Sequence, residues 1–223
     1  MKANNLKKAL EEGKTVFGPF LKFTDPAVVE VMGFSGFNFV IIDEEHGPIS
    51  MQSAQNMIRA AESVNITPVI RVSSNDEALI LIALDIGAQG IEIPQINKKS
   101  DVIQAVKSVK YSPQGERGMC RYVRASSYSS MNKFEYFKCA NKETMIIAHI
   151  EGVEGVKNLD EILSVHGIDV IFIGPYDLSQ SLGIPGEVNH PLVIEKMQEV
   201  ILKCKKKNIA VGTFADDIKT AKL

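Results

Sequence analysis

The sequence has few cysteines. Its 223 residues include only Cys120, Cys139 and Cys204, and their spacing matches no metal-binding motif. An odd and small number of cysteines argues against a disulfide framework and is typical of a reducing cytosol. The stretch 1–14 lacks the apolar centre of a signal peptide and predicts a short amphipathic helix. No apolar run is long enough to cross a bilayer, so we expect a cytoplasmic protein with no membrane partner.

The sequence also lacks an excess of charge of one sign. Lys and Arg number 25 against 27 Asp and Glu, for a formal net charge of −2. This balance gives no indication of a nucleic-acid partner or of a membrane-surface protein. Hydrophobic residues make up 45% and charged residues 23%, as in globular proteins with a sizeable core. No Gly-, Ser- or Pro-rich linker interrupts the chain, so we predict one domain over residues 1–223.

Short apolar runs alternate with stretches of helical periodicity along the whole chain. Ser50, Asn75 and Ser100 are expected to cap three of the helices. Strands that are apolar throughout are typical of parallel sheets covered on both faces. The predicted strands are 15–23, 37–43, 67–72, 90–96, 144–151, 169–174 and 209–214. The predicted helices between them are 26–36, 50–65, 75–88, 100–112, 153–167 and 190–208.

This alternation predicts an α/β fold, open or closed into a barrel. Seven strands, with another helix expected from Asp216 to Leu223, indicate a (β/α)8 TIM barrel. Such barrels typically have about 250 residues. We therefore expect the last strand and the C-terminal helices to lie beyond Leu223.

Polar side chains follow several of the predicted strands at the point where each strand ends. "FVIIDEEHGP" (39–48) passes from an apolar run into a cluster of acidic residues and a histidine. Ligands of parallel α/β folds bind at the carboxyl ends of the strands, where these side chains would converge. The side chains at strand ends are Asp43, Glu45, His46, Arg71, His149, Glu151 and Asp177.

Each residue type suggests a role. Glu151 and Asp177 can supply oxygen ligands to a hard divalent cation. Arg71 can stabilise an oxyanion, and His46 can transfer protons with Asp43 orienting its ring. Backbone amides after Gly174, at Tyr176 and Asp177, can bind a substrate carboxylate. Taken singly, Asp177 also suits a helix cap, Arg71 a structural ion pair and Glu151 a cap of the following segment.

Six stretches together resemble one known family. They are "GFNFVIIDEEHGP", "PVIRV", "LDIGAQGIEIPQI", "YSPQGERG" followed by "VRASSY", "AHIEGVEGVKNLDEI" and "GIDVIFIGPYDLSQSLGIPG". The chain resembles the HpcH/HpaI aldolase/citrate lyase family from Gly18 to about Gly212. It is most similar to the class II pyruvate aldolase branch, which includes 2,4-dihydroxyhept-2-ene-1,7-dioate aldolases.

The resemblance implies a metal-dependent aldolase that cleaves a 4-hydroxy-2-oxo acid into pyruvate and an aldehyde. It implies a small oxo-acid substrate, Mg, Mn or Co as cofactor, and a homo-oligomer, either a trimer or a hexamer. The motifs match Glu151 and Asp177 to the metal ligands, His46 with Asp43 to the acid/base dyad, and Arg71 to the residue that binds the keto oxygen. Phe20 falls where the family usually has a tryptophan that lines the site.

Three positions depart from the family pattern. Glu44 replaces the glycine of Asp-Gly-Glu-His, His149 replaces a glutamine, and Lys22 stands where a small residue is usual. All three bear on substrate preference. His149 is expected on the same face as Glu151, because the two are two residues apart on a strand. We expect it to orient Glu151, although ligation of the metal is also open and would favour Mn, Co or Zn over Mg.

Three other functions stay open at this stage. A malyl- or citramalyl-CoA lyase would share the fold and the metal site. Schiff-base chemistry through Lys22 would need a desolvated lysine. A non-catalytic barrel that only binds an oxo acid would be expected to have lost the acid, base or metal groups, and this sequence retains them.

Overall fold

The computed structural model describes residues 3–217 and residue 221. The chain forms two compact units, and each is described by itself. The first unit contains the chain up to Ile93 together with Ile103–Ile146, and the second contains Pro94–Val102 together with the chain from Ile147 onward. The expectation of a single domain over 1–223 stays a prediction.

The first unit is built on parallel strands that follow one another in chain order. They are β1 (Phe20–Leu21), β2 (Phe39–Asp43), β3 (Thr67–Arg71) and β4 (Gly90–Ile93). Val40, Ile42, Ile70 and Ile91 are fully buried, as expected for a parallel sheet covered on both faces. The register aligns Asp43 with Arg71 across β2 and β3. The last residues of β2 and β3 therefore lie side by side at the carboxyl ends of the two strands.

β1 is much shorter than the predicted strand 15–23. The carbonyls of Phe17 and Pro19 still accept hydrogen bonds from Asn38 N and Ile41 N, at 2.8 and 2.9 Å. Pro19 has no N–H to donate, which interrupts the ladder before Phe20. Only Phe20 and Leu21 therefore form regular strand structure.

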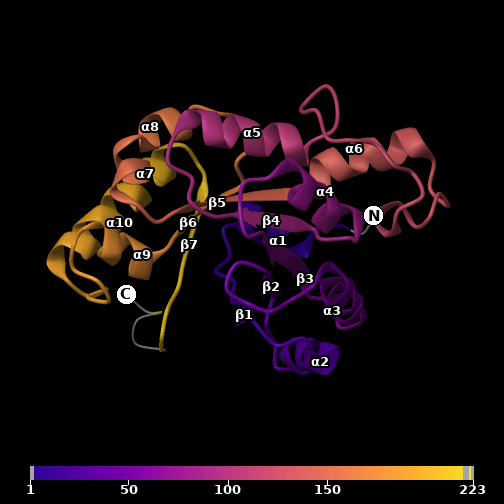
Figure 1. Cartoon of the computed structure of the whole chain (residues 1–223), viewed down its shortest axis with the longest axis horizontal. Helices are drawn as coiled ribbons and strands as arrows, with labels where there is room; N and C mark the ends of the chain where they lie inside the picture. The colour runs from indigo at the N-terminus through magenta and orange to yellow at the C-terminus, as the bar shows by residue number, and fades with distance from the viewer. Residues whose placement is uncertain (1–2, 218–220, 222–223) are drawn as a thin grey trace. The chain divides into compact units, whose positions relative to one another are not determined.

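The helices of the first unit are α1 (Asn5–Glu11), α2 (Pro26–Phe34), α3 (Met51–Ser63), α4 (Glu77–Asp85) and α6 (Lys133–Glu143). α5 (Lys99–Val109) has residues in both units, and a short 3-10 helix covers Arg124–Ser126. Figure 1 shows α2 and α3 next to each other beside β1, β2 and β3. α6 was not predicted. It begins at the N-cap Asn132, whose side chain accepts from Phe134 N and Glu135 N, and it buries Tyr136 and Ala140.

Of the three predicted N-caps, one is confirmed and two are wrong. Ser50 caps α3, and its hydroxyl accepts from Ser53 N at 3.2 Å. The prediction for Asn75 was wrong by one residue, because Asp76 accepts from the first N–H groups of α4. The prediction for Ser100 was also wrong, since α5 already begins at Lys99. There Asp101 reaches back instead, and its carboxylate accepts from the backbone N–H groups of residues 97 and 98.

The second unit contains β5 from Ile147, β6 (Val170–Ile173) and β7 (Ala210–Thr213), again parallel and in chain order. The whole of β5 covers Met145–Ile150. The helices of this unit are α7 (Val153–Lys157), α8 (Leu159–Ile162), α9 (Pro175–Ser181) and α10 (Pro191–Lys206). In Figure 1, α10 lies beside α9 and against β7. The single helix predicted over 153–167 is divided at Asn158, whose side-chain amide donates to Asn97 O at 2.9 Å.

The remaining predicted strands are confirmed within a few residues. Most of the helix expected from Asp216 to Leu223 lies outside the described residues. Within the described part of the chain, no helix combines the length and the apolar character needed to cross a bilayer.

Candidate active site

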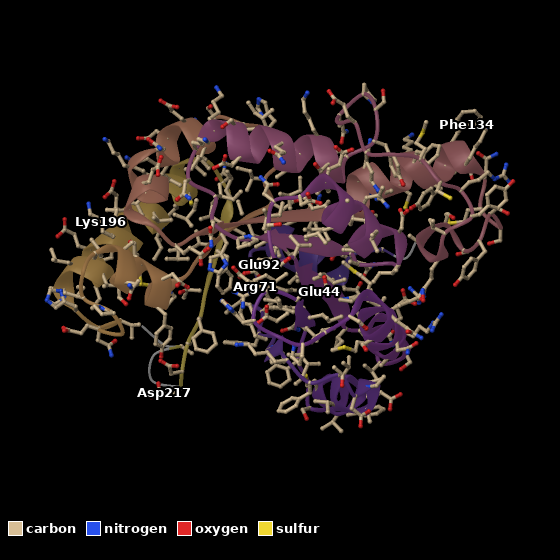
Figure 2. All side chains as sticks on the ribbon, in the orientation of Figure 1. Glu44, Arg71, Glu92, Phe134, Lys196 and Asp217 are labelled. Atoms are coloured by element: carbon tan, nitrogen blue, oxygen red, sulfur yellow. The ribbon has the colours of Figure 1, made fainter. Side chains whose placement is uncertain are left out.

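Charged side chains form a row across the carboxyl ends of β1 to β4 in the first unit. The register aligns Asp43 with Arg71 and Arg71 with Glu92. Leu21 is aligned with Ile42, so Lys22 follows beside Asp43. Figure 2 shows Arg71 and Glu92 close together. The row therefore alternates in sign from Lys22 through Asp43 and Arg71 to Glu92.

Asp43 and Arg71 form a buried, bidentate ion pair. Arg71 Nε donates to Asp43 Oδ1 at 2.9 Å and Nη2 donates to Oδ2 at 2.7 Å. Asp43 is 0% exposed. Burial alone would raise the pKa of Asp43, but the hydrogen bonds and charge of Arg71, with smaller contributions from His46 N–H and Lys22, lower it below its ordinary value. The carboxyl is thus held ionised beside the guanidinium.

Arg71 is fixed from several sides. Nη1 lies 3.1 Å from Glu45 Oε2, and the guanidinium carbon lies 4.8 Å from the centre of the Phe20 ring. Burial works to lower the pKa of Arg71, and the carboxylates of Asp43, Glu92 and Glu45 overcome this and raise it. The result is a permanently charged, preorganised donor at the end of β3, which suits stabilisation of an oxyanion.

His46 lies at the exposed end of the same segment. Its backbone N–H, like that of Glu45, donates to Asp43 Oδ1 at 3.2 Å. Its Nε2 lies 3.9 Å from Glu45 Oε2, beyond hydrogen-bond distance. Asp43 therefore shapes the main chain that carries His46, and its role in orienting the imidazole stays a prediction.

Glu44 is half-buried at the centre of this acidic turn. Its N–H donates to Arg71 O at 3.0 Å, which continues the pairing of β2 with β3. Among residues 3–217 and 221, no partner donates to its buried Oε1 atom. Burial raises the pKa of Glu44 from 4.5 to about 7. At this position, where the resemblance implies a glycine, the chain has a carboxyl whose ionisation is costly.

Glu44→Gln should make the protein more resistant to unfolding at high pH and leave it nearly unchanged at low pH. The folded-state pKa lies above the ordinary value, so the wild type loses stability as pH rises from about 4.5 through about 7. The gain should reach at most about 3 kcal/mol at pH 8.5, where an uncharged amide avoids the desolvation penalty. Urea unfolding at pH 5 and pH 8.5 measures this. Glu30→Gln, at an exposed position of α2, is the control, and an equal gain at both pH values would contradict the prediction.

In the second unit, His149 and Glu151 lie side by side at the end of β5. His149 Nε2 is 3.4 Å from Glu151 Oε2, and both residues are buried. The His149 ring packs edge-on against Phe172, with ring centres 4.9 Å apart. Glu151 Oε1 accepts from Gln95 N at 2.7 Å. One carboxylate oxygen is thereby fixed by the main chain and the other lies next to the imidazole.

The "GPYD" stretch follows β6 in the same unit, and its last three residues form the start of α9. Gly174 precedes the helix, Pro175 occupies its first turn, and Asp177 follows there as an exposed carboxylate. Tyr176 Oη donates to Asp216 Oδ2 at 2.9 Å, and the Tyr176 ring lies against Phe214. The start of α9 is therefore tied to the segment that follows β7.

Gly174→Ala should destabilise the protein by about 1–3 kcal/mol. A Cβ atom at this position would lie 2.6 Å from His149 Nε2 and 2.9 Å from Glu151 Cβ, so both residues would have to move. Urea unfolding measures the loss. Gly118→Ala is the matched control, because within the described part of the chain its Cβ would meet only Leu81, at 3.7 Å or more. Equal stability changes for the two variants would show that the space at Gly174 is not constrained.

Comparison with known proteins identifies the family of this chain. A model of the HpcH/HpaI aldolase/citrate lyase family matches residues 17–222. The chain belongs to this family. It is accordingly a carbon–carbon lyase of the pyruvate aldolase type.

The aldolase is similar to two groups of relatives that have different names. It is 34% identical over 215 residues to the hydroxypyruvate/pyruvate aldolase of Roseobacter denitrificans, covering 96% of this chain and 83% of the relative. It is 35% identical over 216 residues to the 2-keto-3-deoxy-L-rhamnonate aldolase of Salmonella gallinarum, covering 96% and 80%. These two names describe different substrates, so the identity of the substrate does not follow from the family.

Solved structures confirm the fold class expected from the sequence. The aldolase matches an HpcH/HpaI family protein from Burkholderia cenocepacia J2315 with a TM-score of 0.93 and 31% identity, covering 99% of this chain and 88% of that one. The CitE protein of Mycobacterium tuberculosis, solved with magnesium, acetoacetate and coenzyme A, is only 14% identical and has a TM-score of 0.58, covering 92% and 67%. This distant likeness concerns the fold alone.

The residues of the aldolase suit a divalent metal. Glu151 is a buried carboxylate beside Gly174, and Asp177 is an exposed one in the first turn of α9. Carboxylate oxygens are the donors that hard cations prefer. Across residues 3–217 and 221, no group of three or more His, Cys, Asp or Glu side chains is gathered for a metal. Glu151 and Asp177 each supply the type of oxygen donor that such an ion prefers.

Sequence reasoning missed Glu92 and Asp216. Glu92 is completely buried in β4 and contributes to the charge around Arg71. An acidic residue inside the apolar run "GIEI" was the available signal, since a buried carboxylate needs compensation. Asp216 follows β7, and no local pattern links it to Tyr176, 40 residues earlier.

Proposed function

We propose that the protein is a metal-dependent retro-aldolase that cleaves a 4-hydroxy-2-oxo acid into pyruvate and an aldehyde. The observation that carries this proposal is the fixed, buried guanidinium of Arg71 at the end of β3, in a chain of the pyruvate aldolase family. When the C3–C4 bond of a 4-hydroxy-2-oxo acid breaks without a Schiff base, its electron pair is accepted by the 2-oxo group, which becomes an enolate. A rigid cation at that oxygen lowers the energy of the resulting enolate.

Glu151 and Asp177 are proposed to hold the metal, which is Mg, Mn or Co. When bound, the ion would polarise the 2-oxo group of the substrate and offset the charge that develops there. His149, 3.4 Å from Glu151 Oε2, would orient that carboxylate. Gln95 N–H holds the other oxygen of Glu151 at 2.7 Å. Tyr176 and Gly174 would line the part of the site that holds the substrate carboxylate.

His46 is proposed to take the proton of the 4-hydroxyl group, directly or through a water molecule. As that proton leaves, the C4–O bond becomes the carbonyl of the aldehyde and the C3–C4 bond breaks. The electron pair passes into the C2–C3 bond and onto the keto oxygen, which Arg71 stabilises. Protonation at C3 then gives pyruvate. The high exposure of His46 agrees with exchange of protons with solvent.

The aldehyde partner and the assembly are also proposals. The relatives act on hydroxypyruvate and pyruvate, or on 2-keto-3-deoxy-L-rhamnonate, according to their names. We propose that this chain likewise takes small oxo acids. Phe20, which lies beside Arg71, would line the site in place of the family tryptophan. A homo-oligomer, a trimer or a hexamer, is proposed from the family resemblance.

Pyruvate release from a panel of 4-hydroxy-2-oxo acids tests the proposal. Treatment with EDTA should abolish release, and adding back Mg, Mn or Co should restore it. Metal content measured by mass spectrometry before and after treatment gives a readout that does not depend on activity. Cleavage that persists after complete metal removal would overturn the proposed function.

A further inference from the structure

Lys22 is a cation at the carboxyl end of β1 that the proposed mechanism does not use. It follows Leu21, and the register places it beside Asp43. Its Nζ lies 3.8 Å from Asp43 Oδ2, and its side chain is 52% exposed. It therefore stands at the end of the row that contains Arg71, with its ammonium group open to solvent.

Asp43 does not need Lys22 as a hydrogen-bond donor. Its two oxygens already accept from Arg71 Nε, Arg71 Nη2 and the backbone N–H groups of Glu45 and His46. A separation of 3.8 Å is also too long for a hydrogen bond. Within residues 3–217 and 221, this approach is the only ion pair of Lys22, and its ammonium makes no hydrogen bond. Three N–H donors are left for a ligand.

Arg71 is poorly placed to bind such a ligand in place of Lys22. Its side chain is 8% exposed, its donors face Asp43 and Glu45, and Phe20 covers one side of the guanidinium. Glu45 and Glu92 also place negative charge around Arg71. In the proposed mechanism the keto oxygen already engages Arg71, so Lys22 at the β1 end of the row is the cation left for a second anionic group on a substrate. Lys22 is the compact point charge at that position.

We propose that Lys22 is a specificity-determining residue that binds an anionic group, a carboxylate or a phosphate, on the aldehyde partner. This inference rests on the proposed retro-aldol function. It assigns to the protein aldehydes that carry a charge, and correspondingly 4-hydroxy-2-oxo acids with a second anionic group. Neutral aldehydes of the same length are poorer partners.

The test compares Lys22→Met with wild type in condensation of pyruvate with matched aldehydes. One arm pairs succinic semialdehyde with butanal, and the other pairs glyceraldehyde 3-phosphate with glyceraldehyde. For at least one anionic aldehyde, kcat/KM should fall about tenfold, mainly through KM, while the neutral aldehydes change by less than about twofold. The arm with the larger fall identifies a carboxylate or a phosphate. Lys22→Arg should keep most of the preference, because the charge is retained.

Lys107→Met is the matched control. Lys107 is also 52% exposed and has one carboxylate partner, Glu116, at 2.7 Å, but it lies on α5. It should leave both arms unchanged. An equal fall for charged and neutral aldehydes in Lys22→Met would overturn the proposal, because Lys22 would then act through Asp43. Loss of all activity together with borohydride trapping of pyruvate on wild type would overturn it in favour of a Schiff base.

Exchange of the C3 hydrogens of pyruvate in D2O separates this inference from the proposed function. This half-reaction needs no aldehyde. If wild type and Lys22→Met both exchange in a metal-dependent way but show no difference between charged and neutral aldehydes, only the inference fails. If wild type neither exchanges nor cleaves, the proposed function fails and the inference fails with it.

Discussion

Replacing Arg71 with methionine should lower the free energy of unfolding by about 3–5 kcal/mol and reduce the turnover of retro-aldol cleavage by at least about a hundredfold. The stability loss follows because Asp43, which is 0% exposed, would lose the partner that donates to both of its oxygens. The activity loss follows because the fixed guanidinium at the end of β3, the proposed stabiliser of the enolate, would be missing. Urea unfolding and steady-state kinetics per folded enzyme measure the two effects.

Arg117→Met is the control for Arg71→Met. Arg117 also forms a buried ion pair, with Nη2 at 2.7 Å from Asp85 Oδ1, and its guanidinium lies over the Tyr111 ring. Its loss should cost a comparable amount of stability and leave turnover per folded enzyme nearly unchanged. If both variants lost turnover equally, Arg71 would have only a structural role.

Glu151→Gln should weaken binding of Mn²⁺ by at least about a hundredfold while it changes the free energy of unfolding by less than about 1 kcal/mol. The amide oxygen can still accept from Gln95 N, as the carboxylate does at 2.7 Å, so the local structure should persist. Only the charge and one oxygen donor are removed. Calorimetric titration with Mn²⁺ measures the affinity, and pyruvate release should fall in parallel.

Glu154→Gln serves as the control for Glu151→Gln. Glu154 is an exposed glutamate three residues further along, in the first turn of α7. The Glu154→Gln variant should bind Mn²⁺ with the same affinity as wild type. Unchanged affinity in Glu151→Gln would remove Glu151 from the metal site.

Local patterns determined most of the fold. The predicted strand at 37–43 is apolar on both faces over 39–42, and it forms β2 with Val40, Ile41 and Ile42 buried. Such runs need no information from distant residues, because burial on both faces of a parallel sheet favours apolar side chains at successive positions. Pro19 shows where a local rule was overlooked. Its missing N–H limits β1 to Phe20 and Leu21.

Strand ends also identified most of the candidate site from the sequence. Asp43, Arg71 and Glu151 each follow or end an apolar run, and the structure places each at the carboxyl end of its strand. The rule works because parallel strands all present their carboxyl ends at the same edge. Their roles as base, enolate stabiliser and metal ligand stay predictions.

The sequence by itself determined which residues stand at the strand ends, and only the tertiary structure decided which of them bind each other. Asp43 is 28 residues from Arg71, and register alone makes their side chains neighbours and the pair bidentate. The same is true of Glu92, whose charge acts on Arg71, and of Lys22, which stays 3.8 Å from Asp43. Pairing of this kind depends on the alignment of strands that are far apart in the chain, and a one-dimensional pattern carries no information about that alignment.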